Sequence, residues 1–184
     1  MTRLTLHTLD SAPADSRAFV EKAIAGNGFL PNLIGVLANA PLALETYMTV
    51  GAINGRASLT LAEREAVQIT AARIHGCDFC IAGHSALAIK KAGLPRAAVI
   101  ALQSGAACGD VRLDAAASFA QAVIARRGAV DDADFTAFLD AGFDQQQALE
   151  VVLGISLATL CNFANSLAGT PVNDQLAPFL PGAL

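Results

Sequence analysis

Helical spacing of apolar residues, interrupted only by short turns, is the feature that most restricts the fold of this chain. Glycine and proline mark the interruptions, and between them apolar side chains recur at three- and four-residue steps, as at Leu160, Phe163 and Leu167. No stretch alternates apolar and polar residues for long enough to predict a strand. We therefore predict an all-α fold, and a length of 184 residues fits a single helical domain over residues 1–184.

Local signals predict where the helices begin and end. Pro31 and Pro41 fit first-turn positions, where a helix needs no backbone amide donor. Thr60 and Glu63 have the spacing of a capping box, which marks the start of the fourth helix, and Gly26 is expected to end the first. The expected helices cover about residues 14–25, 31–40, 41–55, 61–75, 77–91, 95–104, 113–127, 131–140 and 144–167.

The composition narrows the range of partners. Apolar residues make up 54% of the chain and charged residues 15%, so the chain has enough apolar surface to fold and is not disordered. The formal net charge is −4 and the basic runs are only pairs, Lys90-Lys91 and Arg126-Arg127, so nucleic acid is not an expected partner. A monomer so poor in charge would expose much apolar surface, and we therefore expect a homo-oligomer.

A mean hydropathy of +0.48 raises the question of a membrane segment. The longest uncharged stretches are residues 23–44 and 151–173, and the second is strongly apolar over only 13 residues, 151–163. Since a spanning helix needs about 20 apolar residues, we predict two buried helical regions and no membrane association. The first residues lack the features of a signal peptide, so we expect a cytoplasmic protein, whose four cysteines do not form structural disulfides.

One segment carries a pattern with chemical meaning. Cys77 and Cys80 form a C-x-x-C pair, and His84 follows the second cysteine by four residues. Residues three or four apart share one face of a helix, so these side chains are predicted to line one stripe of the fifth helix. A tight turn at Gly76 would fold the fourth helix back along the fifth and bring Glu65 beside that stripe. The apolar neighbours of Glu65 on its own helix favour its burial.

These residue types together favour covalent thiol chemistry. The thiolate is the nucleophile, and a helix N-terminus or a nearby imidazolium lowers the pKa of a thiol. Cys80 is expected in the first turn of its helix, where unpaired backbone amides point outward. A second thiol three residues away can convert a sulfenic acid into a disulfide. His84 can transfer protons, and Glu65 can hold that histidine and accept its proton.

A structural zinc module is an alternative interpretation of the same residues. Its ligands would be Cys77, Cys80 and His84 with either His75 or Glu65. Structural zinc sites usually combine ligand pairs from separate elements, whereas the two remaining cysteines are single. Of these, Cys108 is expected to be a loop thiol and Cys161 a core residue. We therefore expect neither a metal nor another cofactor.

The run Glu-x11-Cys-x-x-Cys-x3-His on two consecutive helices resembles the alkylhydroperoxidase D branch of the carboxymuconolactone decarboxylase superfamily. The resemblance covers about residues 59–105, the predicted core redox hairpin, and residues 31–55 also resemble the helices that precede this core in related peroxidase-like proteins. It implies an all-α fold, usually a trimer or a higher multiple such as a hexamer, that needs no metal.

The resemblance also implies a role for each residue of the motif. Cys80 would attack the peroxide and become a sulfenic acid, and Cys77 would close the disulfide. Glu65 and His84 would form the proton relay. The substrate is then a hydroperoxide, and a dithiol reductant of the thioredoxin-like or dihydrolipoamide type would restore the thiols.

Four further positions bear on this interpretation. Phe79 takes the place of a histidine that the best-known members of the branch carry immediately before the second cysteine, and His75 is a candidate to replace it. The lactone-decarboxylating branch lacks the cysteine pair, so the pair argues against that activity. Asn162 and Asn165 lie near the end of the last long helix. We expect them to cap it or to face a subunit interface, with a role at the substrate as the alternative.

The function we predict is a thiol-dependent peroxidase or disulfide oxidoreductase that reduces hydroperoxides through the C-x-x-C pair. A non-enzymatic alternative is a redox-sensing or holdase-like oligomer, in which a Cys77–Cys80 disulfide alters assembly. The low charge and high apolar content favour that alternative. Catalytic turnover distinguishes the two, because a sensor would be oxidised slowly and in stoichiometric amount.

Overall fold

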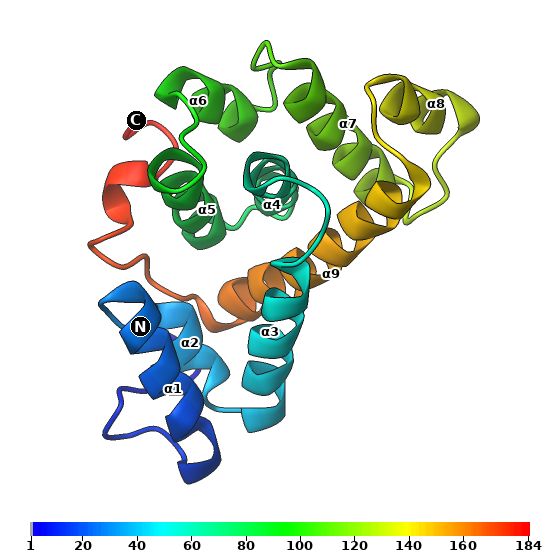
Figure 1. The fold of residues 1–184 in the computed structure, drawn as a ribbon. Helices are drawn as coiled ribbons and strands as arrows, with labels where there is room; N and C mark the ends of the chain where they lie inside the picture. Colours follow the sequence, from blue (N-terminus) through cyan, green and yellow to red (C-terminus); the bar gives the residue numbers. More distant parts are fainter. Residues whose placement is uncertain (1) are drawn as a thin grey trace.

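The computed structural model describes residues 2–184 as helices arranged around α4 (Figure 1). This described part of the chain contains no strand, so the predicted all-α class is confirmed. The helices are α1 (Ala14–Asn27), α2 (Asn32–Leu37), α3 (Pro41–Asn54), α4 (Leu61–Ile74), α5 (Asp78–Lys90), α6 (Arg96–Ser104), α7 (Val111–Ala125), α8 (Asp132–Asp140), α9 (Gln145–Ala168) and the short 3-10 helix η1 (Ala177–Phe179).

Most helix ends lie close to their predicted positions. The capping box at the start of α4 is present, because Glu63 N–H donates to the Thr60 side chain and Thr60 N–H donates to the Glu63 carboxylate. The predicted end of α1 at Gly26 is wrong. The helix continues to Gly28, whose φ of 77° is the left-handed conformation in which glycine commonly ends a helix.

The turn between α4 and α5 is short because Cys77 takes part in both helix ends. Its N–H closes the end of α4, and its side chain caps the start of α5. Gly76 has a φ of 67°, and its N–H donates to the carbonyl of Arg73 while Cys77 N–H donates to the carbonyl of Ala72. This bond pattern is a Schellman motif, which closes the C-terminus of a helix. Cys77 then serves as the N-cap residue of α5. The predicted tight turn at Gly76 is therefore present, and it places Cys77 at the N-terminus of α5.

Two helices organise the packing of the rest. α4 packs against α5, α6, α7 and α9, and α9 packs against α2, α3, α4, α5 and α7 (Figure 1). By length and composition alone, α9 could cross a membrane. One of its faces is nevertheless buried in the bundle, with Gly154, Ala158, Cys161, Asn162 and Asn165 among the residues concerned. The other uncharged stretch, residues 23–44, is divided among α1, α2 and α3.

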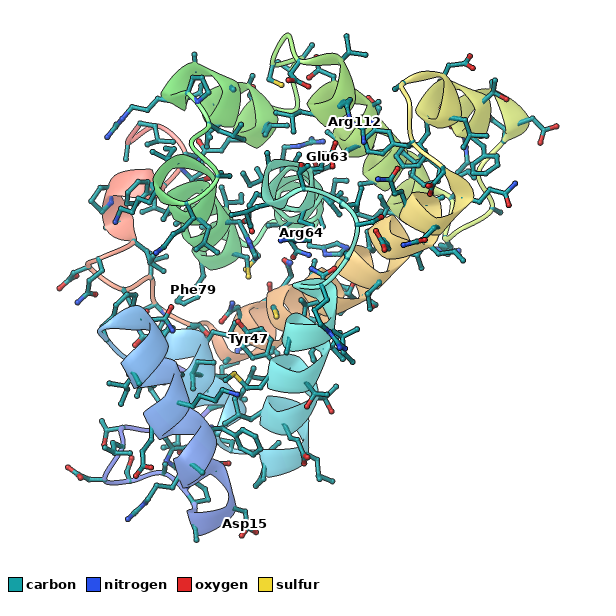
Figure 2. All side chains as sticks on the ribbon, viewed as in Figure 1. Asp15, Tyr47, Glu63, Arg64, Phe79 and Arg112 are labelled. Atoms are coloured by element: carbon teal, nitrogen blue, oxygen red, sulfur yellow. The ribbon has the colours of Figure 1, made fainter. Side chains whose placement is uncertain are left out.

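A partly buried ion pair fixes the start of α4 against α7. Arg112 Nε donates to Glu63 Oε1 at 2.6 Å, and the guanidinium lies 3.9 Å from the centre of the Phe143 ring. Figure 2 labels Glu63 and Arg112, which come together from these two helices. Glu63 is thus used in helix capping and in this ion pair, whereas Glu65, two residues later, remains free to serve the site described next.

Candidate active site

The backbone at the start of α5 holds the two cysteines together. Cys77 is the N-cap residue, and its Sγ accepts a hydrogen bond from the backbone N–H of Cys80 at 3.4 Å. Each residue is 4% exposed, and both are free thiols. From the sequence, the free amides of this helix end were expected to act on Cys80. In the structure, the amide of Cys80 acts on the sulfur of Cys77 instead.

Asn165 of α9 contacts both sulfurs from the opposite side. Its Nδ2 lies 3.2 Å from Cys80 Sγ and 3.8 Å from Cys77 Sγ. The residue is 3% exposed, and its Oδ1 is buried without a hydrogen-bond partner in the described part of the chain. The expectation that Asn165 caps a helix or faces a subunit interface is therefore wrong, because α9 ends at Ala168 with Gly169 as its C-cap, and Asn165 is buried against the cysteines.

Tyr47 and Cys161 also lie near the pair, and the sequence analysis assigned neither of them to it. Cys161 is in the same buried apolar cluster as the two cysteines, which confirms it as a core residue, and Tyr47 packs against that cluster. Figure 2 labels Tyr47 on α3 and Phe79 on α5. Burial raises the pKa of the Tyr47 phenol, and the charges at Cys161, Cys80 and Glu65 raise it further. The phenol is therefore neutral.

Glu65 and His84 meet directly across the α4–α5 hairpin. His84 Nδ1 lies 2.7 Å from Glu65 Oε2, with the histidine side chain 27% exposed and the glutamate side chain 7% exposed. The carboxylate can only accept, so Nδ1 carries the hydrogen and Nε2 is left as the basic nitrogen. His84 lies one helical turn after Cys80 on α5. The predicted burial of Glu65 is confirmed, and its carboxylate fixes the tautomer of His84.

The two cysteines differ in acidity. Hydrogen bonding from the Cys80 side chain lowers the pKa of Cys77 to about 7, against an opposing effect of burial, and the Cys80 backbone and Asn165 lower it further. The contact with Cys77, followed by burial, raises the pKa of Cys80. Burial also raises the pKa of Cys161, to about 12. Once the pair has lost one proton, the remaining proton is therefore favoured on Cys80 and the negative charge on Cys77.

The candidate zinc ligands are not gathered into a metal site. Among residues 2–184, no group of three or more His, Cys, Asp or Glu side chains has an arrangement that could hold a metal ion. His75 is the C-cap residue of α4, and its ring lies 5.0 Å from that of Phe163. Its Nδ1 is buried without a partner in this part of the chain, and burial lowers its pKa.

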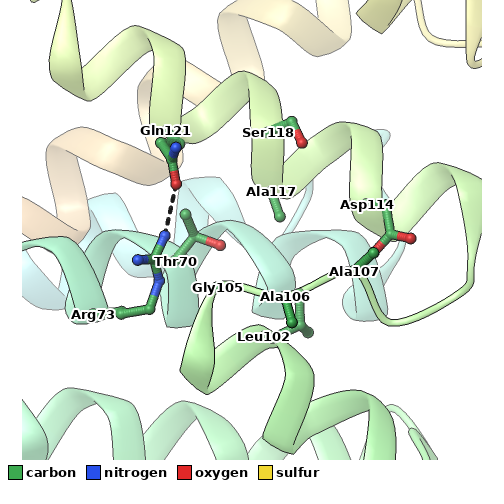
Figure 3. A pocket seen from close by; sticks show the side chains of 10 residues that line it. All are labelled: Thr70, Arg73, Leu102, Gly105, Ala106, Ala107, Asp114, Ala117, Ser118 and Gln121. Carbon is green, nitrogen blue, oxygen red and sulfur yellow. Dashed lines mark hydrogen bonds between the residues drawn. The ribbon is translucent and has the colours of Figure 1, made fainter.

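A separate small pocket lies between α4, α6 and α7 (Figure 3). It has a volume of about 100 Å³, and Arg73 on one wall donates to Gln121 Oε1 at 2.7 Å. Neither the two cysteines nor Glu65 nor His84 lines it. This pocket is therefore not the chamber in which the cysteine pair would meet a substrate.

The middle of the chain is similar to a known protein family. Residues 41–122 match the Carboxymuconolactone decarboxylase family. The matched segment runs from α3 into α7 and includes the cysteine pair, Glu65 and His84. No curated protein sequence matches the chain.

Solved structures share the fold over nearly the whole length. An uncharacterised peroxidase-related protein with an alkylhydroperoxidase AhpD core, from Ralstonia eutropha JMP134, superposes with a TM-score of 0.86 at 24% identity, covering 100% of this chain and 97% of that one. A peroxidase-related protein from Silicibacter sp. TM1040 gives 0.82 at 20% identity, with coverages of 95% and 93%. The debrominase Bmp8, as a cysteine-to-alanine variant in complex with 2,3,4-tribromopyrrole, gives 0.82 at 17% identity, with coverages of 100% and 98%.

The acidity of Cys77 predicts a pH dependence. In the reduced protein, thiolate absorbance should rise with a midpoint near pH 7. Because the pKa of Cys77 is lower in the folded than in the unfolded chain, the resulting stabilisation is present above the unfolded pKa and is lost as the pH falls through about 7. The Cys80→Ala variant lacks the thiol whose hydrogen bond lowers the pKa of Cys77 most, so its midpoint should move toward the ordinary thiol value. An unchanged midpoint in a folded variant would contradict this account.

Proposed function

We propose that this chain is a thiol-dependent peroxidase or disulfide oxidoreductase that reduces hydroperoxides. Residues 41–122 match the Carboxymuconolactone decarboxylase family, and the fold is that of a structure with an alkylhydroperoxidase AhpD core. On this basis we assign the chain to the alkylhydroperoxidase D-like branch of that superfamily. The observation that carries the proposal is a pair of free cysteines at the start of α5, one of them acidic, on the helix that also carries the Glu65-bound His84. An acidic thiol, a resolving thiol and an oriented base are the groups that dithiol catalysis needs.

The first step is attack of the Cys80 thiolate on the terminal oxygen of the hydroperoxide. A sulfur–oxygen bond forms, the oxygen–oxygen bond breaks, and the alkoxide leaves as an alcohol after taking a proton. In the second step the Cys77 thiolate attacks the sulfenic acid of Cys80. A sulfur–sulfur bond forms, the sulfur–oxygen bond breaks, and hydroxide leaves as water after taking a proton.

The two steps consume one proton more than the thiols and the hydroperoxide supply, and we assign the delivery of this proton to His84, oriented by Glu65. The two products carry three protons, whereas the resting pair supplies one and the hydroperoxide supplies one. The third comes from solvent, and His84 is suited to deliver it because its side chain is 27% exposed while Glu65 orients the ring from the interior. A dithiol reductant, thioredoxin-like or of the dihydrolipoamide type, then restores the pair by thiol–disulfide exchange.

Peroxide reduction is one member of a wider class of two-electron reductions open to a dithiol. One of the structures with this fold is a debrominase, so a brominated pyrrole belongs beside an organic hydroperoxide in the first set of assays. The redox-sensor alternative predicts a single oxidation without turnover in either assay. Zinc analysis of protein purified without chelator tests the zinc alternative. We place all of this activity in the cytoplasm.

Variants of the motif test the proposal in steady-state turnover of an organic hydroperoxide. Cys80→Ser should abolish turnover, and Glu65→Gln should slow it by about 10²–10⁴, the usual contribution of general base catalysis. Matched controls are Cys108→Ser, a partly exposed cysteine, and Glu21→Gln, an exposed glutamate of α1. Both controls should retain wild-type rates. Unchanged turnover in Cys80→Ser would contradict the assignment of Cys80 as the nucleophile.

We also propose that the protein is a homo-oligomer, a trimer or hexamer. The outer face of α9 carries an exposed apolar stripe: Leu149, Val152, Phe163 and Leu167, from 45% to 72% exposed. A second copy of the chain is the proposed partner for these residues, since several large apolar side chains exposed on one helix favour a protein–protein contact. Light scattering should give three or six times the chain mass of 18.8 kDa. A monomer mass would contradict this part of the proposal.

A further inference from the structure

We propose that Asn165 is a catalytic residue that moves the negative charge of the cysteine pair onto Cys80, the sulfur that attacks. The inference rests on the proposed thiol chemistry and adds to it a residue of α9, which lies outside the Glu-x11-Cys-x-x-Cys-x3-His motif. Asn165 touches both reacting sulfurs, so its action on the chemistry is direct.

The resting arrangement creates the need for such a residue. Cys77 Sγ accepts the backbone N–H of Cys80 and caps the positive end of α5. This contact favours the thiolate at Cys77, so Cys80 retains the shared proton. Cys80 must lose that proton before it can attack a hydroperoxide, because the thiolate is the nucleophile.

Asn165 favours the opposite distribution of charge. Its Nδ2 lies closer to Cys80 Sγ, at 3.2 Å, than to Cys77 Sγ, at 3.8 Å. An amide N–H binds an anion more strongly than a neutral acceptor, so the shorter contact strengthens most when Cys80 is charged. The step is a proton transfer alone: the S–H bond of Cys80 breaks, an S–H bond of Cys77 forms, and no electron changes place.

The same donor can serve the second half of the reaction. Once Cys80 has become a sulfenic acid, the attacking thiolate is Cys77, and Nδ2 carries a second hydrogen within reach of that sulfur. A single carboxamide between the two sulfurs can therefore stabilise each thiolate in turn. The two cysteines and Asn165 are buried, and burial strengthens such hydrogen bonds relative to water.

Packing does not explain an asparagine at this position. Asn165 is 3% exposed, its Oδ1 has no partner among residues 2–184, and its Nδ2 contacts the two sulfurs. A buried amide with an unmade hydrogen bond destabilises a fold, so an apolar side chain would serve packing better. Other titratable groups that act on this region are Tyr47, Glu65, Asp78 and Cys161.

Thiol titration tests the inference without any substrate. Cys77→Ser leaves Cys80 as the single sulfur of the pair, and Cys80→Ser leaves Cys77. Adding Asn165→Ala should raise the measured pKa of Cys80 by about one to two pH units, the contribution of a hydrogen bond to a charged group. The shift at Cys77 should be smaller, because its contact is longer. The matched control is Asn162→Ala, another buried asparagine of α9 with no contact to either sulfur in the described chain.

Kinetics supply the second arm. In the Cys77→Ser background, Asn165→Ala should slow sulfenic acid formation by roughly 10- to 100-fold, and Asn162→Ala should leave the rate near that of the background. Asn165→Asp keeps the shape of the side chain but removes the N–H donor, so it should slow sulfenic acid formation at least as much as Asn165→Ala does. It also provides a test if the alanine variant fails to fold.

Three results would overturn the role of Asn165: equal shifts at both sulfurs, no shift at Cys80, or wild-type behaviour of Asn165→Asp. An Asn162→Ala variant as slow as Asn165→Ala would assign the effect to packing of α9. Failure of the proposed function is recognised separately, because it would leave the titration shifts intact while peroxide turnover is absent.

Discussion

The arrangement of this site depends on the closed turn between α4 and α5. A Schellman motif ends α4 at Gly76, in the left-handed conformation, and its last bond is donated by Cys77 N–H. The same residue then caps α5 with its sulfur. Because no loop intervenes, the two helices run side by side from this point, and Glu65 lies opposite His84. A longer turn would change both the register of that pair and the backbone contact that contributes to the lowered pKa of Cys77.

The second constraint is the burial of the dithiol beneath α9. Both sulfurs are almost withdrawn from water, so the location of one proton depends on a few nearby donors rather than on solvent. One donor, the backbone N–H of Cys80, is fixed by the helix itself. The other, Asn165, comes from a helix that also supports α2, α3 and α4. In the proposed reaction, two donors act on one shared charge: the backbone N–H of Cys80 favours the thiolate at Cys77, and Asn165 favours it at Cys80.

Sequence reasoning succeeded where the physics is local. The capping box of Thr60 and Glu63 spans three residues, and the stripe of cysteines and histidine follows from the helical repeat. The meeting of Glu65 and His84 needed one further step, a tight turn at a glycine. Whether Cys77 or Cys80 gains from the helix end was decided by a shift of one residue in the start of α5, which lies within the ordinary uncertainty of helix ends.

The contact of Asn165 with the cysteines could not be predicted from local sequence rules, because 85 and 88 residues separate it from Cys80 and Cys77 along the chain. No local rule places α9 against the start of α5. A signal was nevertheless present, since Ala158, Cys161 and Asn165 share one face of an apolar helix and a polar side chain on a buried face calls for a partner. Tyr47 is a similar case, because its approach depends on how α3 packs against the same cluster.

The central claim, that Cys77 and Cys80 act together as a dithiol that reduces a hydroperoxide, is tested most directly by mass spectrometry of the peptide that carries both. Reduced protein receives one equivalent of an organic hydroperoxide and is then quenched with an alkylating agent under denaturing conditions. The account predicts that both thiols disappear within seconds as one internal disulfide, while Cys108 and Cys161 remain alkylatable. If the pair stays alkylatable for minutes and Cys108 or Cys161 reacts first, the pair is not a peroxide site and the account is contradicted.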